Sequence, residues 1–532
     1  MVAETTALSA GSRPASLPRR AEGVLSGVPL HPVLLGAYLV LLVYSNNLAE
    51  IPPSDVLVPL AVVALVAGLL TIALAVVLHD PPRAGLLATS LLVPFLAFAF
   101  IRDAVSSYWS GDDRILALSL VVIMSALVIA MERMRSRIPT LTLALNVVSA
   151  LVVAMVLVPI VSYVNVAWSR SEGVVDTSPV LLATVPKSGA DESTRDIYHL
   201  VFDRYGSNDA LWIGHGIDNA PFTRSLESQG FHVVDDARAN YRGSAMSLAA
   251  TLGMSLLDEI AAQMGPDVGY YGPILERLEH SRVGAWLQDR GYEYHHIGSW
   301  YPPTASSAIA DRSYGPRVSN DLATTLIDNS VLPVILDPFP SADRRHADAA
   351  EYQFEVLEGL VVEPAEQPRY VFAHVLVPHP PYVFSADGAF MPDDADAASQ
   401  LEYTNARIRS LVDQLLDRPP DERPIIILQA DEGPYPDGFY DIDSDFAWES
   451  ATDDELAMLY GVLNAMYLPG PEGEQGLPAS MTLVNTYPEV LDRYFDEGIP
   501  RQLDRSWASR TETPYALTEV TDRLDAIAGS DR

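Results

Sequence analysis

The sequence predicts an N-terminal bundle of five transmembrane helices followed by an α/β domain with a mainly parallel sheet. Two observations predict this fold. Between residues 29 and 164, apolar segments recur, each near the roughly 20 residues that cross a bilayer as a helix. Beyond them, short apolar runs typical of buried strands alternate with helical stretches, as in a parallel sheet covered on both faces.

The apolar segments define a membrane anchor. Short loops separate them, which argues against a buried helical bundle in a soluble protein. None carries Asp, Glu, Lys or Arg near its centre, so an ion or proton pathway is not expected. The predicted spans are residues 29–48, 57–78, 85–101, 115–131 and 139–164. The predicted domains are a cytoplasmic tail (1–27), a transmembrane anchor domain (28–164), a linker (165–195) and an extracytoplasmic domain (196–532).

The loop arginines predict the orientation. With five spans, one side of the membrane receives Arg13, Arg19, Arg20, Arg83, Arg133, Arg135 and Arg137. The opposite loops hold two arginines beside several acids. Because positive loops stay in the cytoplasm, everything after residue 164 is expected outside the cell membrane. A missing or additional span would reverse this placement.

Composition excludes several classes of function. The formal net charge is −35, whereas nucleic-acid binding needs a basic surface. The chain has no cysteine, which excludes disulfides, a cysteine nucleophile and cysteine-ligated metal sites.

The α/β domain is predicted from ten segments. The expected strands are residues 197–202, 231–234, 292–297, 369–376, 424–430 and 462–468. The expected helices are 220–229, part of 273–290, 319–336 and 397–417.

Acidic side chains follow two of these strands. Asp203 comes directly after the first strand, and Asp431 and Glu432 follow the strand at 424–430. Ligands bind at the carboxyl ends of strands in open α/β sheets, and paired carboxylates suit a hard metal cation. These three acids are therefore candidate metal ligands.

A serine and two histidines are further candidates. Ser244 precedes an expected helix, whose free amides favour an anion, so it could be a metal-activated nucleophile or simply a helix cap. His379 lies between prolines after a strand and could donate to an oxyanion or act as an acid. We interpret His374, inside that strand, as a core residue or one that supports a ligand.

From residue 196 to 521 the chain resembles the sulfatase-like hydrolase/transferase branch of the alkaline phosphatase superfamily. It is most similar to membrane-anchored bacterial members, and more distantly to lipoteichoic acid synthases and phosphoethanolamine transferases. The matching stretches, in order along the chain, are 196–206, 230–254, 298–300, 372–384, 425–434, 463–470 and 484–486.

The resemblance implies an alkaline phosphatase/sulfatase-like fold and a set of site residues. One divalent metal ion would be held by Asp203, Ser244, Asp431 and Glu432, with Ser244 as the nucleophile. The family histidine corresponds to His379, which would contact the anionic group of an ester. Arg204 could bind that ester or merely fill space, and Arg242 is a further candidate to bind it. Relatives often have threonine at the serine position and commonly glycine where this chain has Arg204.

Glu432 is the main departure from the family pattern, which reads Asp-His-Gly where this chain has Asp-Glu-Gly. Oxygen-only ligation favours Mn²⁺, Mg²⁺ or Ca²⁺ over Zn²⁺. A more negative set of ligands also weakens the metal as a Lewis acid and repels an anionic ester.

Two functions therefore stay open. The first is a membrane-anchored, extracytoplasmic, metal-dependent phospho- or sulfo-ester transferase or hydrolase acting on a cell-envelope or lipid-linked glycan. The second is a catalytically degenerate relative that binds an envelope glycan or a partner without turnover. The expected partners are the lipid bilayer and an anionic ester or glycan, and no nucleic acid.

Overall fold

The chain folds into two compact units in a computed structural model. The structure describes residues 27–48, 51, 53–106, 108, 111–133, 135–171, 195–315, 321–336, 341–436, 448–471, 473 and 476–530. The helical unit comprises Met1–Asn47, Pro52–Ile160 and Leu322–Phe339, and the α/β unit comprises Leu48–Ile51, Val161–Asp321 and Pro340–Arg532. Most of the predicted tail, residues 1–26, and most of the predicted linker, residues 172–194, lie outside the described residues.

The helical unit contains the apolar segments of the N-terminal region. Its elements are α2 (His31–Ser45), α3 (Ser54–Leu78), α4 (Pro81–Leu96), α5 (Phe98–Val105), α6 (Asp113–Arg133), the 3₁₀ turn η1 (Arg135–Arg137) and the beginning of α7 (Ile138–Ser171). In the described residues, Asp55–Leu78 and Arg135–Ala167 are long and apolar enough to cross a membrane. The bent pair α4 and α5 would make a third span. The described helices therefore support two or three spans, and not clearly the five predicted.

The junction between α4 and α5 is a broken helix. The two helices meet at a bend of 66° around Ala97, three residues after Pro94, whose ring disfavours a continuous helix. In an unbroken helix the Ala99 amide would donate to the Phe95 carbonyl. Instead, Ala99 N donates to Asn329 O at 3.0 Å, and Phe95 O accepts from Val331 N at 2.9 Å.

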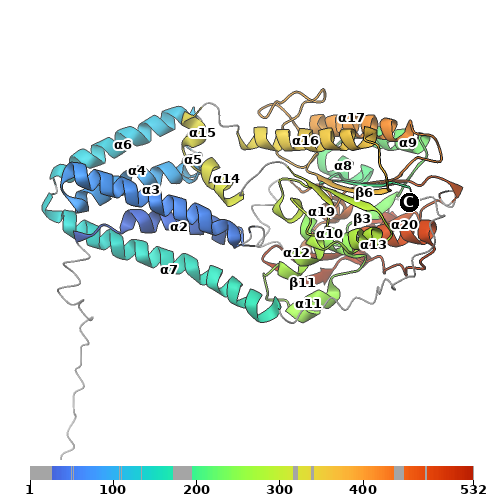
Figure 1. Cartoon of the computed structure of the whole chain (residues 1–532), viewed down its shortest axis with the longest axis horizontal. Coiled ribbons are helices and arrows are strands. Elements are labelled where there is room, and N and C mark those ends of the chain that lie inside the picture. The colour runs from blue at the N-terminus through green and yellow to red at the C-terminus, as the bar shows by residue number, and fades with distance from the viewer. Residues whose placement is uncertain are drawn as a thin grey trace, which may run out of the picture. The chain divides into compact units, whose positions relative to one another are not determined.

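Asn329 and Val331 belong to a segment that the sequence places between two elements of the α/β unit. This segment contains α14 (Asp321–Asp328) and α15 (Leu332–Ile335), and the chain from Leu322 to Phe339 belongs to the helical unit. Within that unit α15 contacts α6 (Figure 1). The sequence predicted one helical stretch at 319–336. The structure divides it into two helices, and the residues between them form the main-chain hydrogen bonds to the broken helix.

The α/β unit includes the last part of α7, from Val161, and contains the remaining elements. Its strands are β1 (Ile197–Phe202), β2 (Phe231–Val233), β3 (Asp236–Arg238), β4 (Glu293–Ile297), β5 (Arg312–Tyr314), β6 (Arg369–Val375), β7 (Ile425–Gln429), β8 (Asn464–Tyr467), β9 (Ser480–Thr482), β10 (Trp507–Arg510) and β11 (Thr513–Glu519). Its α-helices are α8 (Asn208–His215), α9 (Ala220–Ser228), α10 (Ser244–Gly253), α11 (Asp258–Met264), α12 (Gly272–Glu279), α13 (Arg282–Gln288), α16 (Ala342–Val362), α17 (Ala397–Leu416), α19 (Asp453–Tyr460), α20 (Thr486–Phe495) and α21 (Thr521–Ser530), with 3₁₀ turns η2 (Pro302–Thr304), η4 (Trp448–Ser450) and η6 (Leu483–Asn485).

The described strands form a seven-stranded sheet in the order β2-β8-β7-β1-β6-β4-β5, with two small two-stranded sheets beside it. Strand β1 pairs in parallel with β6 and β7, and β4 pairs in parallel with β6 and β5. Strand β8 runs antiparallel to β7 and to β2. This arrangement confirms the predicted α/β domain with a mainly parallel sheet.

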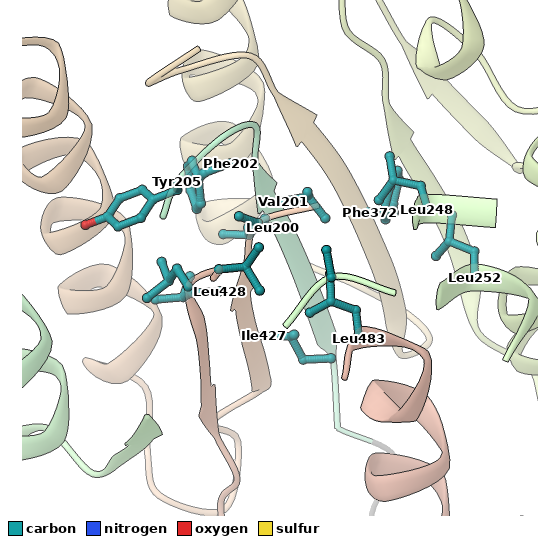
Figure 2. Packing of buried hydrophobic residues seen from close by; sticks show 14 of the residues in the cluster. Leu200, Val201, Phe202, Tyr205, Leu248, Leu252, Phe372, Ile427, Leu428 and Leu483 are labelled. Carbon is teal, nitrogen blue, oxygen red and sulfur yellow. The ribbon is translucent and has the colours of Figure 1, made fainter. Parts of the chain in front are cut away.

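The centre of the sheet is buried on both faces. Every residue of β1, β6 and β7 is buried, as their continuous apolar character requires. Figure 2 shows Phe372 of β6 beside Leu248 and Leu252 of α10, within one cluster that also contains Leu200 and Leu428. Helix α10 is itself buried at each of its residues. This packing fixes the three central strands whose carboxyl ends carry the site.

Candidate metal centre and active site

The three central strands bring chemically active side chains to one edge of the sheet. The strand register pairs Val201 of β1 with His374 of β6 and with Gln429 of β7. Two residues further along β1 and β7 come Asp203 and Asp431. Because side chains two positions apart share a face of a strand, the imidazole and the two carboxylates converge.

Asp203, His374 and Asp431 form a compact cluster. The His374 Nε2 atom lies 3.6 Å from Asp203 Oδ2 and 3.6 Å from Asp431 Oδ2. One donor atom from each residue lies within 4.8 Å of the others, and all three residues are buried. Among the described residues, His374 Nε2, Asp203 Oδ1 and both carboxylate oxygens of Asp431 have no hydrogen-bond partner.

Buried polar atoms without partners are costly, so this convergence requires an explanation. Two carboxylates and one imidazole are an ordinary donor set for a divalent cation. The His374 ring is also oriented as metal-binding imidazoles are, because its Nδ1 atom lies 2.8 Å from Thr304 Oγ1. The residues present therefore fit one divalent metal ion.

The electrostatics of the two carboxyl groups agree with this interpretation. Burial, reinforced by the charges of Asp431 and Glu432, holds the pKa of Asp203 well above its ordinary value. Burial acts in the same direction on Asp431, but His374 and the Ser244 hydroxyl outweigh it and lower the pKa of Asp431. Two buried carboxylates at this separation need a counter-charge to ionise together, and a divalent cation would supply it.

Ser244 is the first residue of α10 and lies beside this cluster. It is buried, and the preceding Gly243 adopts φ +87° and ψ +127°, a conformation that glycine reaches without steric strain. The helix N-terminus presents main-chain amides and the positive end of its dipole. The serine hydroxyl is thus placed where both a cation and an anionic ester can reach it.

A cavity of about 470 Å³ opens over these groups. Its lining includes six of the seven residues predicted from the sequence to form the site, namely Asp203, Arg204, Arg242, Ser244, His379 and Glu432. The seventh, Asp431, belongs to the buried cluster. The structure therefore brings all seven to one place, from strand ends and loops far apart in sequence.

His379 and Arg204 are two of the polar residues that line the cavity. Burial and the charge of Arg204 lower the pKa of His379 well below its ordinary value, so its imidazole is neutral near pH 7. The His379 Nδ1 atom contacts the Pro380 carbonyl. Arg204 has φ +59°, a left-handed backbone conformation that costs energy for any residue other than glycine. Residues held in such costly conformations cluster at functional sites.

Glu432 contacts three neighbouring residues through its carboxylate. Its Oε2 atom accepts hydrogen bonds from Gly243 N and from Tyr435 Oη, each at 2.7 Å. Its Oε1 atom lies 3.4 Å from Arg204 Nε. The sequence analysis counted Glu432 as a ligand and His374 as a core or supporting residue, whereas the cluster described above contains His374 and not Glu432.

The membership of His374 in this cluster could not be recognised from the linear sequence alone. The signal that could have pointed to His374 is a polar residue in an otherwise apolar strand, five residues before His379. Its significance depends on β6 lying next to β1, which the linear sequence does not specify. With His374 included, the donors are no longer oxygen alone, and the donor set does not separate Zn²⁺ from Mn²⁺ or Mg²⁺.

Comparison with known families identifies the class of protein. The Sulfatase family model matches residues 195–468, slightly more than half of the chain. The chain therefore belongs to the sulfatase family, a group of hydrolases and transferases within the alkaline phosphatase superfamily. No curated protein matches the chain.

Several solved structures are similar to the chain at low sequence identity. The C-terminal periplasmic domain of EcEptC from Escherichia coli has a TM-score of 0.42 and 11% identity, covering 66% of this chain and 98% of that one. The lipoteichoic acid synthase LtaP from Listeria monocytogenes has a TM-score of 0.36 and 14% identity, covering 69% and 97%. The soluble domain of lipooligosaccharide phosphoethanolamine transferase A from Neisseria meningitidis has a TM-score of 0.34 and 10% identity, covering 63% and 95%.

Proposed function

We propose that this chain is a membrane-anchored, extracytoplasmic, metal-dependent transferase or hydrolase of phosphate or sulfate esters. Its proposed substrate is a lipid-linked or cell-envelope glycan, and its nucleophile is Ser244. One observation carries the proposal. Buried donor atoms of Asp203, His374 and Asp431, without hydrogen-bond partners in the described part of the chain, converge beside a serine that begins a buried helix.

The chemistry follows from the positions of the side chains. A divalent cation held by Asp203, His374 and Asp431 would stabilise negative charge on the ester and lower the pKa of the serine hydroxyl. Ser244 Oγ would then bond to phosphorus or sulfur while the bond to the leaving oxygen breaks. The leaving group would depart as an alcohol and carry the proton that serine gave up.

The second half of the reaction would regenerate the enzyme. Water or an acceptor hydroxyl would cleave the serine ester and return the proton to Ser244 Oγ. His379 and Arg204, which line the cavity, would hold the anionic oxygens of the ester. A neutral imidazole and a fixed cation are both suitable donors to such oxygens.

A labelling experiment tests the nucleophile. Purified full-length protein, supplied in turn with Mn²⁺, Mg²⁺ or Zn²⁺, would be incubated with an aryl phosphate and an aryl sulfate, followed by intact-mass measurement. We expect a covalent phosphate or sulfate adduct and release of the aryl alcohol, both lost in Ser244→Ala. Ser225→Ala is the matched control, because this serine lies on α9 and its hydroxyl donates to the Phe222 carbonyl one turn earlier.

The outcomes distinguish the two functions that the sequence left open. Metal binding without adduct or turnover with either ester would identify a binding protein that has lost catalysis. Turnover that survives Ser244→Ala would remove serine from the mechanism and leave the metal site in place.

The proposed location is the outer side of the cell membrane. It is supported by the positive-inside rule applied to the five predicted spans, which puts the arginine-rich loops on the opposite side. Because the chain has no cysteine, single cysteines can report the topology without background. We expect Ser228→Cys in the α/β unit to react with a membrane-impermeant maleimide in intact cells. Ser136→Cys, in the arginine-rich turn η1, should react only after permeabilisation. The reverse pattern would place the α/β unit in the cytoplasm.

A further inference from the structure

Glu432 connects the loop after β7 to the helix that begins with Ser244. Its side chain is buried, and its Oε2 atom accepts the Gly243 amide hydrogen at 2.7 Å. Gly243 directly precedes the proposed nucleophile, so the carboxylate holds the main chain of the turn that presents it. The carbonyl of the same glycine accepts from Met246 N and Ser247 N, each at 3.1 Å. Gly243 is thus held at both its amide nitrogen and its carbonyl oxygen.

The neighbouring residue makes a second connection to the same helix. Ser247 Oγ donates to the main-chain carbonyl of Asp431 at 2.6 Å. Two consecutive residues of the β7 loop therefore hold the first turn of α10, one through a main-chain oxygen and one through a carboxylate. Because Asp431 is also a member of the buried cluster, this pair sets the distance between the proposed metal site and Ser244.

The charge of Glu432 is balanced on the side away from Gly243. Arg204 Nε lies 3.4 Å from Glu432 Oε1, and its guanidinium carbon lies 3.8 Å above the centre of the Tyr435 ring. Burial and the Glu432 charge raise the pKa of Tyr435 well above its ordinary value, so its hydroxyl remains a donor. Glu432 thereby also holds Arg204 at the wall of the cavity.

From these contacts we propose that Glu432 is a positioning residue for the reaction and not a metal ligand. It orients Ser244 through the Gly243 amide and fixes Arg204, while His374 supplies the imidazole for the metal. This inference rests on the proposed function. It assigns a role to the residue at which this chain departs from the Asp-His-Gly pattern of the family.

Metal titration separates the two roles of Glu432. Calorimetric titration of full-length protein with Mn²⁺ and with Zn²⁺ would compare Glu432→Gln, Glu432→His, His374→Ala and Asp431→Asn. We expect Glu432→Gln to keep its metal Kd within about threefold of the unchanged chain and Glu432→His not to tighten binding. His374→Ala and Asp431→Asn should weaken binding by at least about tenfold. Equal losses in Glu432→Gln and Asp431→Asn would overturn the inference.

Labelling kinetics test the positioning role. Glu432→Ala removes the acceptor of the Gly243 amide and should slow formation of the Ser244 adduct about 10- to 100-fold, in kcat more than in KM. Glu432→Gln retains an acceptor oxygen and should recover part of this loss. Glu489→Gln is the matched control, because this glutamate pairs with Arg493 away from the site. Full activity of Glu432→Ala would refute the positioning role.

A measurement without turnover keeps the test independent of the proposed function. Hydrogen exchange of the main chain at residues 243–247 should be faster in Glu432→Ala than in the unchanged chain, because the hydrogen bond between the Gly243 amide and the carboxylate is lost. If the chain proves to have no ester activity, this exchange and the metal titrations still decide whether Glu432 holds the turn or the metal. Unchanged exchange together with weakened metal binding would show that Glu432 is a ligand.

Discussion

Thr304 is the residue that fixes the direction of the His374 imidazole. Its hydroxyl lies 2.8 Å from His374 Nδ1 and 2.8 Å from Ser299 Oγ, and its carbonyl lies 3.0 Å from His296 Nε2. For Nε2 to bind a cation, Nδ1 must carry the hydrogen and donate it to Thr304. With Nδ1 donating to Thr304, Nε2 carries no hydrogen where it faces Asp203 and Asp431.

We expect Thr304→Val to weaken divalent metal binding by about 10- to 100-fold, the usual effect of removing a partner of a ligating histidine. Valine has almost the same shape as threonine but cannot accept the hydrogen from Nδ1. Calorimetric titration with Zn²⁺ or Mn²⁺ measures the change. Thr404→Val, which removes a buried hydroxyl bonded to Gln400 O on α17, should leave metal binding unaltered. Equal losses in both variants would show a general effect on folding.

Single residues also mark how far the sequence could predict the site. Asp203 and Asp431 were recognised because acids that end apolar strands lie at the sheet edge where ligands bind. The role of His374 depends on which strands are neighbours, and that of Glu432 on contact with Gly243, 189 positions away in the chain. Such contacts are properties of the tertiary structure and leave no local pattern.

At the scale of elements, the strongest apolar runs were predicted and the shortest elements were not. Strands β1, β6 and β7 agree closely with the predicted 197–202, 369–376 and 424–430 because each is continuous and fully buried. Strands β3 and β9 each have three residues and pair with each other across more than 240 positions of the chain. The long helix α16 was also missed. The broken helix of the anchor was predicted as one continuous span, because its partner lies more than 200 residues further along the chain.

We expect Val331→Pro to destabilise the helical unit. Proline would remove the amide that donates to Phe95 O and leave that carbonyl without this partner, at a cost of about 1–3 kcal/mol. Val331 has φ −75°, which proline tolerates. The loss of stability should therefore come from the missing hydrogen bond and not from backbone strain at this position. Thermal unfolding of the full chain in detergent would show a lower Tm. Val331→Ala keeps the amide and serves as the control. An equal decrease in Tm in both variants would assign the effect to side-chain packing.

At the scale of the whole molecule, buried neutral histidines make stability depend on pH. Burial lowers the pKa of His199 to about 4, and it lowers the pKa of His296 to about 4. The unfolded chain binds a proton at each histidine near the model-peptide value of about 6.5, whereas the folded chain does so only near pH 4. Each histidine therefore reduces the free energy of unfolding as pH falls from about 6.5 toward 4, by up to about 1.4 kcal/mol per pH unit.

We expect replacement of His199 to reduce this dependence. His199→Gln should make the slope of unfolding free energy against pH shallower between pH 6.5 and 4, by the contribution of up to one proton. Denaturant unfolding of the full chain across this range measures the slope, whatever the variant does to absolute stability. His280→Gln, at an exposed position, controls for specificity to the buried imidazole. An unchanged slope in His199→Gln would show that other groups cause the pH dependence.

The segment Leu322–Phe339 has a practical consequence for studying the enzyme in isolation. A fragment that begins near Arg195 would contain every residue of the site, and cleavage in the predicted linker would look sufficient to release it. That fragment would contain α14 and α15 but lack the broken helix. The main-chain hydrogen bonds of Asn329 and Val331 to that helix would then be lost. Exposed Ile335 and the buried Leu322 and Leu326 would then face water together. A water-soluble version of the α/β unit should therefore bridge residues 321 and 340 with a short polar loop, and its solubility would show how much the segment depends on the anchor.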